Sequence, residues 1–473
     1  LAQIYEVDLK DDRRTISTLQ NLAKLRPDWI PGLEELRRIY GKVGAWKDLV
    51  KIISAEIPLI EELGQKLALL QEQAEVYEQK LKEPGSAINA LLSAHSLSPE
   101  DRTILSGLER LYQELNKWPE LAGVVEKKIR LAQNDEERVQ FETQAGELYE
   151  EKLKDFAKAI DHYEQAEKIV PEQILILRAL ERLYPALNRF RELIRVLEKL
   201  AVLVRTDEER ALIVNQIGKI YYDRLNEIEP AIESHSRALK IDPVNQTALE
   251  CLVLLFREKK DPGNLVKMLE RLAEVIKEMN PESARDLYLE AGETYEKGLS
   301  DENSAINCYK KASALVPKDL RPIQAERKIY ERRGDWKEVA RVLEQEVKIL
   351  PSPEEKKQTY ARIGNIWEQK LSDAERAIGF YRAGLELDSE YLDALRPLAE
   401  IYYQKKSFAP AEPLYKIWTR HLPEEPPQSQ PRILYNFGVV EEKLGKIEPA
   451  VDAYERASQL KAHYLEPLDR LFE

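Results

Sequence analysis

A short motif recurs along this chain at an almost constant interval, and this periodicity constrains the fold more than any other feature. The reference position of the motif follows an alanine in most copies and is an isoleucine, replaced by valine in the last copy. It recurs every 72 to 74 residues, at Ile16, Ile88, Ile160, Ile232, Ile306, Ile378 and Val451. A fixed period of this length indicates supersecondary units that stack on their neighbours, rather than one globular core.

Within each copy the apolar residues have helical spacing. In the third copy they follow the three-to-four spacing of an amphipathic helix, at Ala159, Ile160, Tyr163, Ala166 and Ile169. Pro171 then ends this helix, because proline has no backbone N–H and disfavours helix in the residue before it. Capping signals open the third to sixth copies at Asn134, Thr206, Asn280 and Ser352. We therefore expect four helices in each copy, arranged as two hairpins of about 34 to 38 residues.

The composition agrees with a helical, acidic protein. Charged residues make up 33% of the 473 residues and only 18 are glycine, which favours long helices. The net charge of −13 argues against a nucleic-acid-binding surface. Cys251 and Cys308 belong to no disulfide or metal-binding pattern, and no run of about 18 apolar residues predicts a membrane helix. We expect a cytoplasmic protein, with a periplasmic location left open, and because the chain begins at Leu1 we expect a piece of a longer one.

The sequence contains little catalytic material. Its five histidines are scattered, and none has the spacing of a metal-binding pair. The stretch PGNL at 262–265 predicts a turn and not a phosphate-binding loop, and the chain has no nucleophile motif. Carboxylates are abundant, but on helix surfaces they are normally solvated. We therefore expect no catalytic, cofactor-binding or metal-binding residues, and no enzyme activity.

The first hairpin of each copy resembles the tetratricopeptide repeat, whose signature places small, aromatic and proline residues in fixed order on two antiparallel helices. The third copy matches it at Gly146, Tyr149, Ala159, Tyr163, Ala166 and Pro171, and the fifth at Gly292, Tyr295, Ala305, Tyr309, Ala312 and Pro317. The resemblance covers essentially the whole chain. It implies an all-α, right-handed superhelical solenoid of about 13 hairpins in units of about 72 residues, with a concave groove lined by the first helix of each hairpin.

The chain departs from this signature in two ways. Most first hairpins carry one extra residue between the aromatic residue and the alanine, as in YEEKLKDFAKA, and the second hairpins lack the small residues, so we expect them to be degenerate repeats. The expected solenoid covers 1–420, in units that start near residues 1, 63, 135, 207, 281 and 353, followed by a proline-rich linker at 421–432 and a partial unit at 433–473. The linker is either a longer loop within the same solenoid or a hinge or docking loop.

A register of charged residues is the most suggestive functional feature. In the first helices, the residue after the aromatic position is mostly acidic: Glu6, Glu78, Glu150, Tyr222, Glu296 and Glu368. In the second hairpins, the residue two before the aromatic position is mostly basic: Arg38, Arg110, Arg182, Leu254, Lys328 and Glu400. The resemblance implies that both rows line the groove. They either pair with each other across neighbouring helices or bind a charged peptide or helix, and their interruption at Tyr222 and Leu254 marks a candidate apolar anchor.

These observations favour a non-catalytic scaffold that binds a partner protein or peptide along the groove. Two alternatives stay open: a structural or self-assembling subunit of a larger complex, and a regulatory segment of a longer chain that carries an enzyme domain elsewhere. We expect protein or peptide partners, with self-association kept as an alternative, and we expect neither nucleic acid binding nor membrane insertion.

Overall fold

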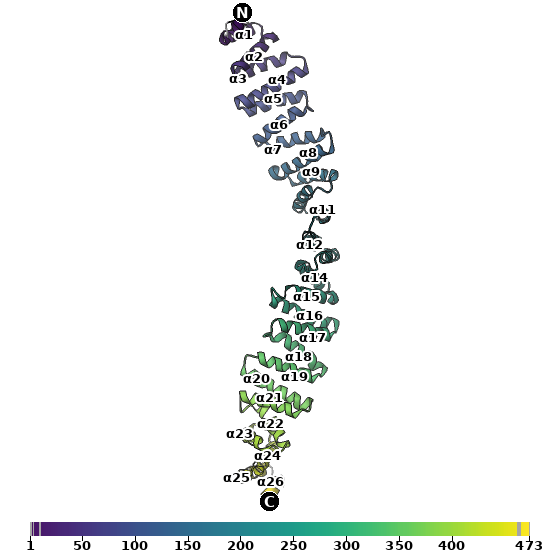
Figure 1. Cartoon of the computed structure of the whole chain (residues 1–473), viewed down its shortest axis with the longest axis vertical. Helices are drawn as coiled ribbons and strands as arrows, with labels where there is room; N and C mark the ends of the chain where they lie inside the picture. The colour runs from purple at the N-terminus through teal and green to yellow at the C-terminus, as the bar shows by residue number, and fades with distance from the viewer. Residues whose placement is uncertain (1, 3, 9–10, 461–464, 473) are drawn as a thin grey trace. The chain divides into compact units, whose positions relative to one another are not determined.

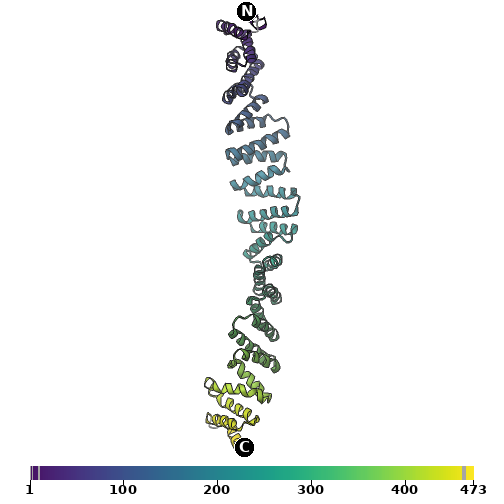
Figure 2. The same cartoon turned by 60° about the vertical axis from the view of Figure 1, so that its left-hand side comes forward.

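The computed structural model describes residues 2, 4–8, 11–460 and 465–472. The chain divides into two compact units, Leu1–Ser234 and His235–Glu473. Every regular element of the described residues is helical, and 26 of them are α-helices, which confirms the predicted all-α solenoid of helix hairpins. Within each unit, successive helices lie side by side in chain order (Figure 1), and this order is also seen in the rotated view (Figure 2).

The helices follow the expected copies closely. The first unit contains α1 (Asp12–Leu25), α2 (Ile30–Val43), α3 (Trp46–Glu56), α4 (Leu63–Glu75), α5 (Pro84–Leu97), α6 (Arg102–Glu114), α7 (Trp118–Arg130), α8 (Asp135–Leu148), α9 (Phe156–Ile169), α10 (Ile174–Leu183), α11 (Phe190–Leu203) and α12 (Asp207–Asp223). The boundary between the two units falls within α13 (Ile228–Ile241).

The second unit continues the same pattern. It contains α14 (Gln246–Glu258), α15 (Pro262–Ile276), α16 (Pro281–Thr294), α17 (Glu302–Leu315), α18 (Leu320–Arg333), α19 (Trp336–Ile349), α20 (Pro353–Asn365), α21 (Ala374–Leu387), α22 (Leu392–Gln404), α23 (Phe408–Arg420), α24 (Gln430–Lys443), α25 (Ile447–Leu460) and α26 (Leu465–Phe472). From α2 to α25, the first helix of each hairpin has an even number and the second an odd number. We call them the A helix and the B helix.

The capping residues predicted from the sequence lie at helix ends, whereas the stretch 262–265 forms the start of α15 and not the turn that the sequence predicts. The side chain of Asn134 accepts a hydrogen bond from the Glu137 amide, and Thr206 and Ser352 cap α12 and α20 in the same way. Such side chains replace the missing partners of the first helical N–H groups. At the other end of a hairpin, α9 stops at Ile169, two residues before Pro171.

In five first hairpins the extra residue is accommodated in a π-helical turn at the end of the A helix, whereas α12 of the fourth copy is α-helical to Asp223. These turns are η1 (Ile4–Asp8), η3 (Val76–Leu81), η4 (Tyr149–Leu153), η6 (Tyr295–Leu299) and η7 (Ile366–Lys370). In the third copy, Lys154 follows the turn with a φ of 56°, and the Asp155 amide donates to the Tyr149 carbonyl at 2.9 Å. A π turn absorbs one residue without ending the helix, so the predicted insertion has a definite place.

The residues of the repeat signature form the core between helices. Ala159 and Ala166 are completely buried and Tyr163 is 2% exposed. Small side chains let neighbouring helices approach closely, while the aromatic ring fills the space between one hairpin and the next. In the second unit, one apolar cluster extends from Ala305 in α17 to Ile401 in α22, so each hairpin depends on its neighbours for burial.

The recurrent tryptophans are packing residues, as expected. Trp336 lies partly buried against the core of the second unit, and the Lys370 ammonium lies 5.2 Å from the centre of its ring. The same arrangement recurs for Trp118, with Lys152 at 5.5 Å. A cation over an indole face adds a modest attraction.

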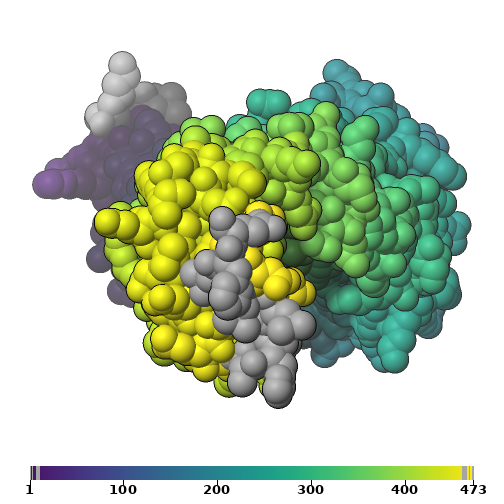
Figure 3. Space-filling model, turned by 90° about the horizontal axis from the view of Figure 1, so that it is seen from below, coloured from purple at the N-terminus to yellow at the C-terminus, as the bar shows by residue number. Residues whose placement is uncertain are grey.

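The proline-rich segment 421–432 is compact where it leaves α23. It begins with a 3₁₀ turn, η8 (Leu422–Glu424), in which Leu422 is buried. Trp418 donates a hydrogen bond to Glu425 at 2.9 Å, and one apolar cluster includes side chains from both α23 and α24. In the space-filling view from below, the yellow C-terminal residues lie in front of the green residues that precede them (Figure 3). Whether the segment acts as a hinge stays a prediction, as do the expected domain limits.

Two further 3₁₀ turns occur between helices. They are η2 (Ile57–Leu59), after α3, and η5 (Tyr184–Leu187), after α10.

Candidate functional site

The two charged rows predicted from the sequence lie on the A helices and their π-helical ends. The acidic row occupies the π turns, with Glu6 in η1, Glu78 in η3, Glu150 in η4, Glu296 in η6 and Glu368 in η7. The other row lies on α2, α6, α10, α14, α18 and α22, where Arg38, Arg110, Arg182, Leu254, Lys328 and Glu400 occupy equivalent positions. We call the surface that carries these two rows the A face and describe it separately for each unit.

In the first unit the two rows pair with each other. Three glutamates each bind the arginine of the following A helix: Glu6 with Arg38 at 2.5 Å, Glu78 with Arg110 at 2.6 Å, and Glu150 with Arg182 at 2.6 and 2.8 Å. The glutamate side chains are at most 20% exposed, whereas the arginines are at least half exposed. The hydrogen bond from Arg38 holds the pKa of Glu6 below its usual value. The ion-pair interpretation of the rows is therefore what the structure shows in this unit.

The glutamates of the third, fifth and sixth copies have a second partner beneath them. The Tyr163 hydroxyl donates to Glu150 at 3.3 Å, and the equivalent pairs are Tyr309 with Glu296 at 3.2 Å and Tyr381 with Glu368 at 2.8 Å. Burial, together with the neighbouring carboxylate, raises the pKa of each of these tyrosines. The acidic row thus links the buried signature tyrosine to the surface. The sequence analysis missed this link, although tyrosine and glutamate recur at a constant spacing of 13 residues.

The fifth copy pairs its charges differently. Glu296 binds Arg332 at 2.8 Å instead of the predicted Lys328. Arg332 lies one helical turn after Lys328 on α18 and therefore on the same helix face, a signal that the sequence contains. Lys328 is exposed and forms no ion pair with any residue that the structure describes.

In the sixth copy the basic position holds a carboxylate. Glu400 lies 3.3 Å from Arg432, which belongs to the next A helix. Burial raises the pKa of Glu400; nearby Glu368 also raises it and Arg432 opposes them. The A face thus changes from acid–base pairs in the first unit to two neighbouring carboxylates with a single arginine here.

The fourth copy lacks both charges. Leu254 on α14 is 45% exposed, and Tyr222 on α12 is half-buried. The two residues belong to different compact units. That they form one apolar anchor stays a prediction.

Two adjoining clefts open on the A face of the second unit. One, of about 640 Å³, is bordered by α16 and α18 and contains the predicted residues Glu296 and Lys328. The other, of about 610 Å³, lies against α14, the end of α15 and α16, and includes Glu250 and Met279. Both volumes are in the range of sites that take peptide side chains or small ligands.

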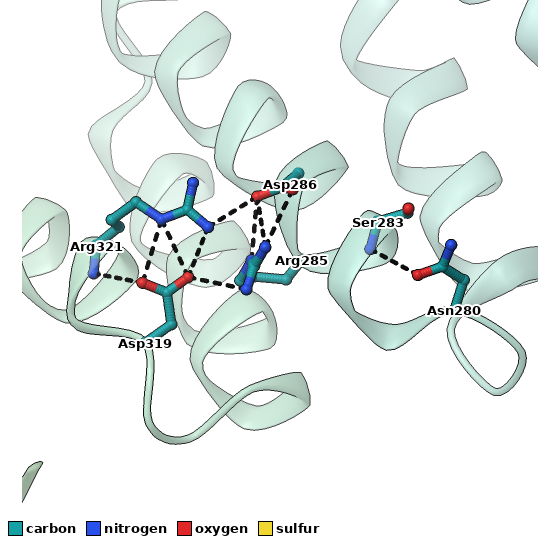
Figure 4. Close-up of polar contacts among 6 residues, drawn as sticks. All are labelled: Asn280, Ser283, Arg285, Asp286, Asp319 and Arg321. Carbon is teal, nitrogen blue, oxygen red and sulfur yellow. Dashed lines mark hydrogen bonds and ion pairs between the residues drawn. The ribbon is translucent and has the colours of Figure 1, made fainter.

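A cluster of two arginines and two aspartates lies beside the two clefts and contributes lining residues to them (Figure 4). Arg321 binds Asp286 at 3.0 Å and Asp319 at 2.7 Å, while Arg285 binds the same two carboxylates at 3.0 and 3.1 Å. Asp286 borders both clefts. The arginines hold the pKa values of Asp286 and Asp319 below their usual range. Asp319 also accepts from the Arg321 amide at 3.0 Å and so caps α18.

Chemistry other than binding has little support among the described side chains. Within the described ranges, no group of three or more histidine, cysteine or acidic residues is placed to hold a metal ion. His235 is buried, as its packing position predicts. Cys308 is also buried, which raises the pKa of its thiol to about 12 and leaves almost none as the nucleophilic thiolate. None of the helices in the described part combines the length and apolar character needed to cross a membrane.

Comparison with known proteins agrees with this architecture. Family models of the tetratricopeptide repeat match residues 104–139, 176–211 and 431–464. Two of the three matches fall on second hairpins, which we expected to be the more degenerate ones. No curated protein matches the chain.

Among solved structures, the chain is similar to several repeat proteins at low identity. One is YrrB, described as a TPR protein with an unusual peptide-binding site, at 15% identity over 43% of this chain and 100% of that chain, with a TM-score of 0.28. The C-terminal part of a TPR repeat-containing protein from Cytophaga hutchinsonii matches at 18% identity over 56% and 99% of the two chains, with a TM-score of 0.28. PilF of Pseudomonas aeruginosa matches at 16% identity over 56% and 98%, with a TM-score of 0.26.

Proposed function

Because the chain is a tetratricopeptide repeat protein, we propose that it acts as a non-catalytic scaffold that binds a partner protein or peptide along the A face. The observation that carries this proposal is the pair of adjoining clefts on α14, α16 and α18, where side chains from successive hairpins border one continuous strip. A strip of this kind suits an extended or helical segment of another chain, which buries a few side chains in the clefts.

The paired glutamates are better suited to holding hairpins together than to contacting a ligand. Glu150 is 13% exposed and accepts hydrogen bonds from both Arg182 and Tyr163. A carboxylate with two good donors gains little from a third. Ligand contacts would come instead from the exposed arginines above it and from positions where the pairs are absent, such as Leu254 and Lys328.

The test is to remove the acidic row without disturbing the tyrosines beneath it. In a triple variant, Glu78, Glu150 and Glu296 are each changed to Gln, because glutamine keeps an oxygen acceptor for the tyrosine hydroxyl while losing the charge. The matched control changes three exposed glutamates of B helices to Gln: Glu120 on α7, Glu233 on α13 and Glu386 on α21. Circular dichroism checks that both variants remain helical.

The readout is the set of proteins that cross-link to the tagged chain in its native extract. We expect the control variant to keep the partners of the unmodified chain and the A-face variant to lose them or exchange them, because its arginines are no longer neutralised. An A-face variant that is folded and keeps the same partners would show that binding occurs elsewhere. Concentration-dependent oligomers that survive both sets of changes in sedimentation experiments would favour the self-assembling subunit instead.

A further inference from the structure

The two clefts of the second unit each contain one charged side chain without an ion-pair partner. Lys328, in the cleft between α16 and α18, has no carboxylate within 4.0 Å among the described residues. Glu250, in the cleft beside α14, accepts a hydrogen bond from Gln246 at 2.8 Å but forms no ion pair with a described residue. Each side chain is exposed. The strip therefore ends in a carboxylate on one side and an ammonium group on the other.

The charges between these two ends are already neutralised. Glu290 binds Arg257 at 2.8 and 2.9 Å, and Asp286 binds Arg321 at 3.0 Å. Figure 4 shows the latter contact as part of the cluster of two arginines and two aspartates. A ligand that crosses the strip gains little electrostatic attraction from its middle, because opposite charges there already contact each other. Charge recognition is left to Glu250 and Lys328.

The lining of the two clefts offers apolar surface as well. Met279 is 74% exposed beside Glu250, and Leu287 and Leu289 border the two clefts from α16. Apolar side chains of a ligand would find their contacts there, and burial of each would contribute more to affinity than an exposed ion pair. The two end charges would set the position of the ligand and exclude segments of the wrong charge.

The spacing of the ends limits the ligand. Glu250 and Lys328 lie on α14 and α18, two A helices apart, and the contacts of Arg257 with Glu290 and of Arg321 with Asp286 join each helix to α16. If successive A helices have the usual interaxial distance of roughly 10 Å, the two ends are roughly 20 Å apart. An extended chain advances about 3.3 Å per residue, and about six residues span this distance.

We propose that this strip binds an extended segment of a partner protein in which a basic and an acidic side chain, about six residues apart, contact Glu250 and Lys328 and apolar residues lie between them. The proposal rests on the scaffold function and adds the chemical class of the ligand. The register of unpaired charge selects a segment of mixed charge over one of uniform charge. It does not select a chain direction, because the basic residue can come before or after the acidic residue in the sequence of the segment.

The test uses a display library of random twelve-residue peptides, selected against the full chain and against two charge-reversed variants, Lys328→Glu and Glu250→Lys. From the unmodified chain we expect enrichment of peptides with opposite charges about six residues apart. Lys328→Glu should shift the selection to two basic residues at that spacing, and Glu250→Lys to two acidic residues. Chosen synthetic peptides should lose at least tenfold in affinity when tested against the variant that did not select them.

Matched controls make the same charge changes on B helices of the same unit. Lys337→Glu on α19 and Glu386→Lys on α21 alter exposed residues outside the clefts and should leave the selected peptides unchanged. The proposal is overturned if both cleft variants select the same peptides as the unmodified chain, or if no charge pattern is enriched. Peptides whose binding is lost with Leu254→Asp but not with the cleft variants would overturn this inference while leaving the scaffold function intact.

Discussion

The ring of Tyr381 lies directly against Gly364: a Cβ atom on this glycine would be 2.6 Å from the ring Cε1. No real Cβ contact is that short. A Cβ atom on Gly146 would likewise be 2.8 Å from the Tyr163 ring, and one on Gly292 would lie even closer to the Tyr309 ring. The signature glycine therefore allows the A helix to approach the tyrosine ring of its own B helix.

We expect Gly364→Ala to destabilise the sixth copy by about 1–3 kcal/mol, the usual effect of forcing extra atoms into a packed core. The matched control is Gly379→Ala on α21, where nothing lies within 4 Å of the added Cβ. This change should stabilise the same hairpin by about 0.5–1 kcal/mol, because alanine is the better helix former. Hydrogen exchange of peptides from α20 and α21 measures both, since global unfolding of a repeat array need not be two-state.

Equal protection in the two alanine variants would contradict this account. It would mean that the tyrosine ring moves aside without cost and that the glycine is present for another reason.

A second prediction concerns the asymmetry of the Glu150–Arg182 pair. Glu150→Ala should destabilise the third copy by about 1–3 kcal/mol, because it leaves the nearly buried Tyr163 hydroxyl without its acceptor. Arg182→Ala should cost less than about 1 kcal/mol, because Arg182 is 61% exposed and its ion pair is a surface one. Urea unfolding, monitored by hydrogen exchange in α8 to α10, compares the stability losses of the two variants.

Tyr163→Phe serves as the control for this explanation. In the Phe background, Glu150→Ala should lose most of its effect, because no hydroxyl remains to be left unpaired. An unchanged effect would place the stabilisation in the arginine contact instead.

The sequence predicts the packing of this protein better than it predicts its surface. Ala159, Tyr163 and Pro171 have counterparts in most copies, and their periodicity marks them as packing and helix-end residues, because the core repeats with the fold. The sequence register points to Lys328 as the partner of Glu296, but the structure shows Arg332 in this place. The choice could not be predicted, because two cations one helical turn apart can both reach the same carboxylate. The clefts depend on side chains from three helices, and the distances between helices are not contained in a linear register.

A third prediction uses Asp319, which both caps α18 and joins the cluster in Figure 4. Asp319→Asn keeps a good helix cap but loses the charge that binds Arg285 and Arg321, so we expect a loss of about 1–2 kcal/mol near neutral pH. The arginines hold the pKa of Asp319 below 3.8, its ordinary value. A lowered folded-state pKa gives stabilisation that is present above 3.8 and is lost as the pH falls through the folded-state pKa.

The stability difference between the unmodified chain and Asp319→Asn should therefore be constant near neutral pH and shrink in acid. Denaturation at a series of pH values, with Asp393→Asn on α22 as an exposed control, measures this dependence. A difference that does not change with pH would show that the charge of Asp319 adds nothing to its role as a cap.

The last prediction concerns Glu400, whose pKa is shifted in the opposite direction to that of Asp319. Its pKa is raised, first by burial and then by Glu368, with Arg432 opposing. A raised folded-state pKa gives stability that is fully present below the ordinary value of 4.5 and is lost as the pH rises through the folded-state pKa. Near neutral pH the ionised carboxylate is therefore a cost to the fold, even though it contacts Arg432 at 3.3 Å.

We expect Glu400→Gln to stabilise the sixth copy near neutral pH, by on the order of 0.5 kcal/mol. The gain should disappear below pH 4.5, where Glu400 is protonated in both states. Hydrogen exchange of peptides from α22 and α24 follows the effect, and Glu386→Gln, an exposed residue on α21, is the control. A loss of stability near neutral pH would mean that the Arg432 ion pair outweighs burial and the repulsion from Glu368, and that this part of the A face is not under electrostatic strain.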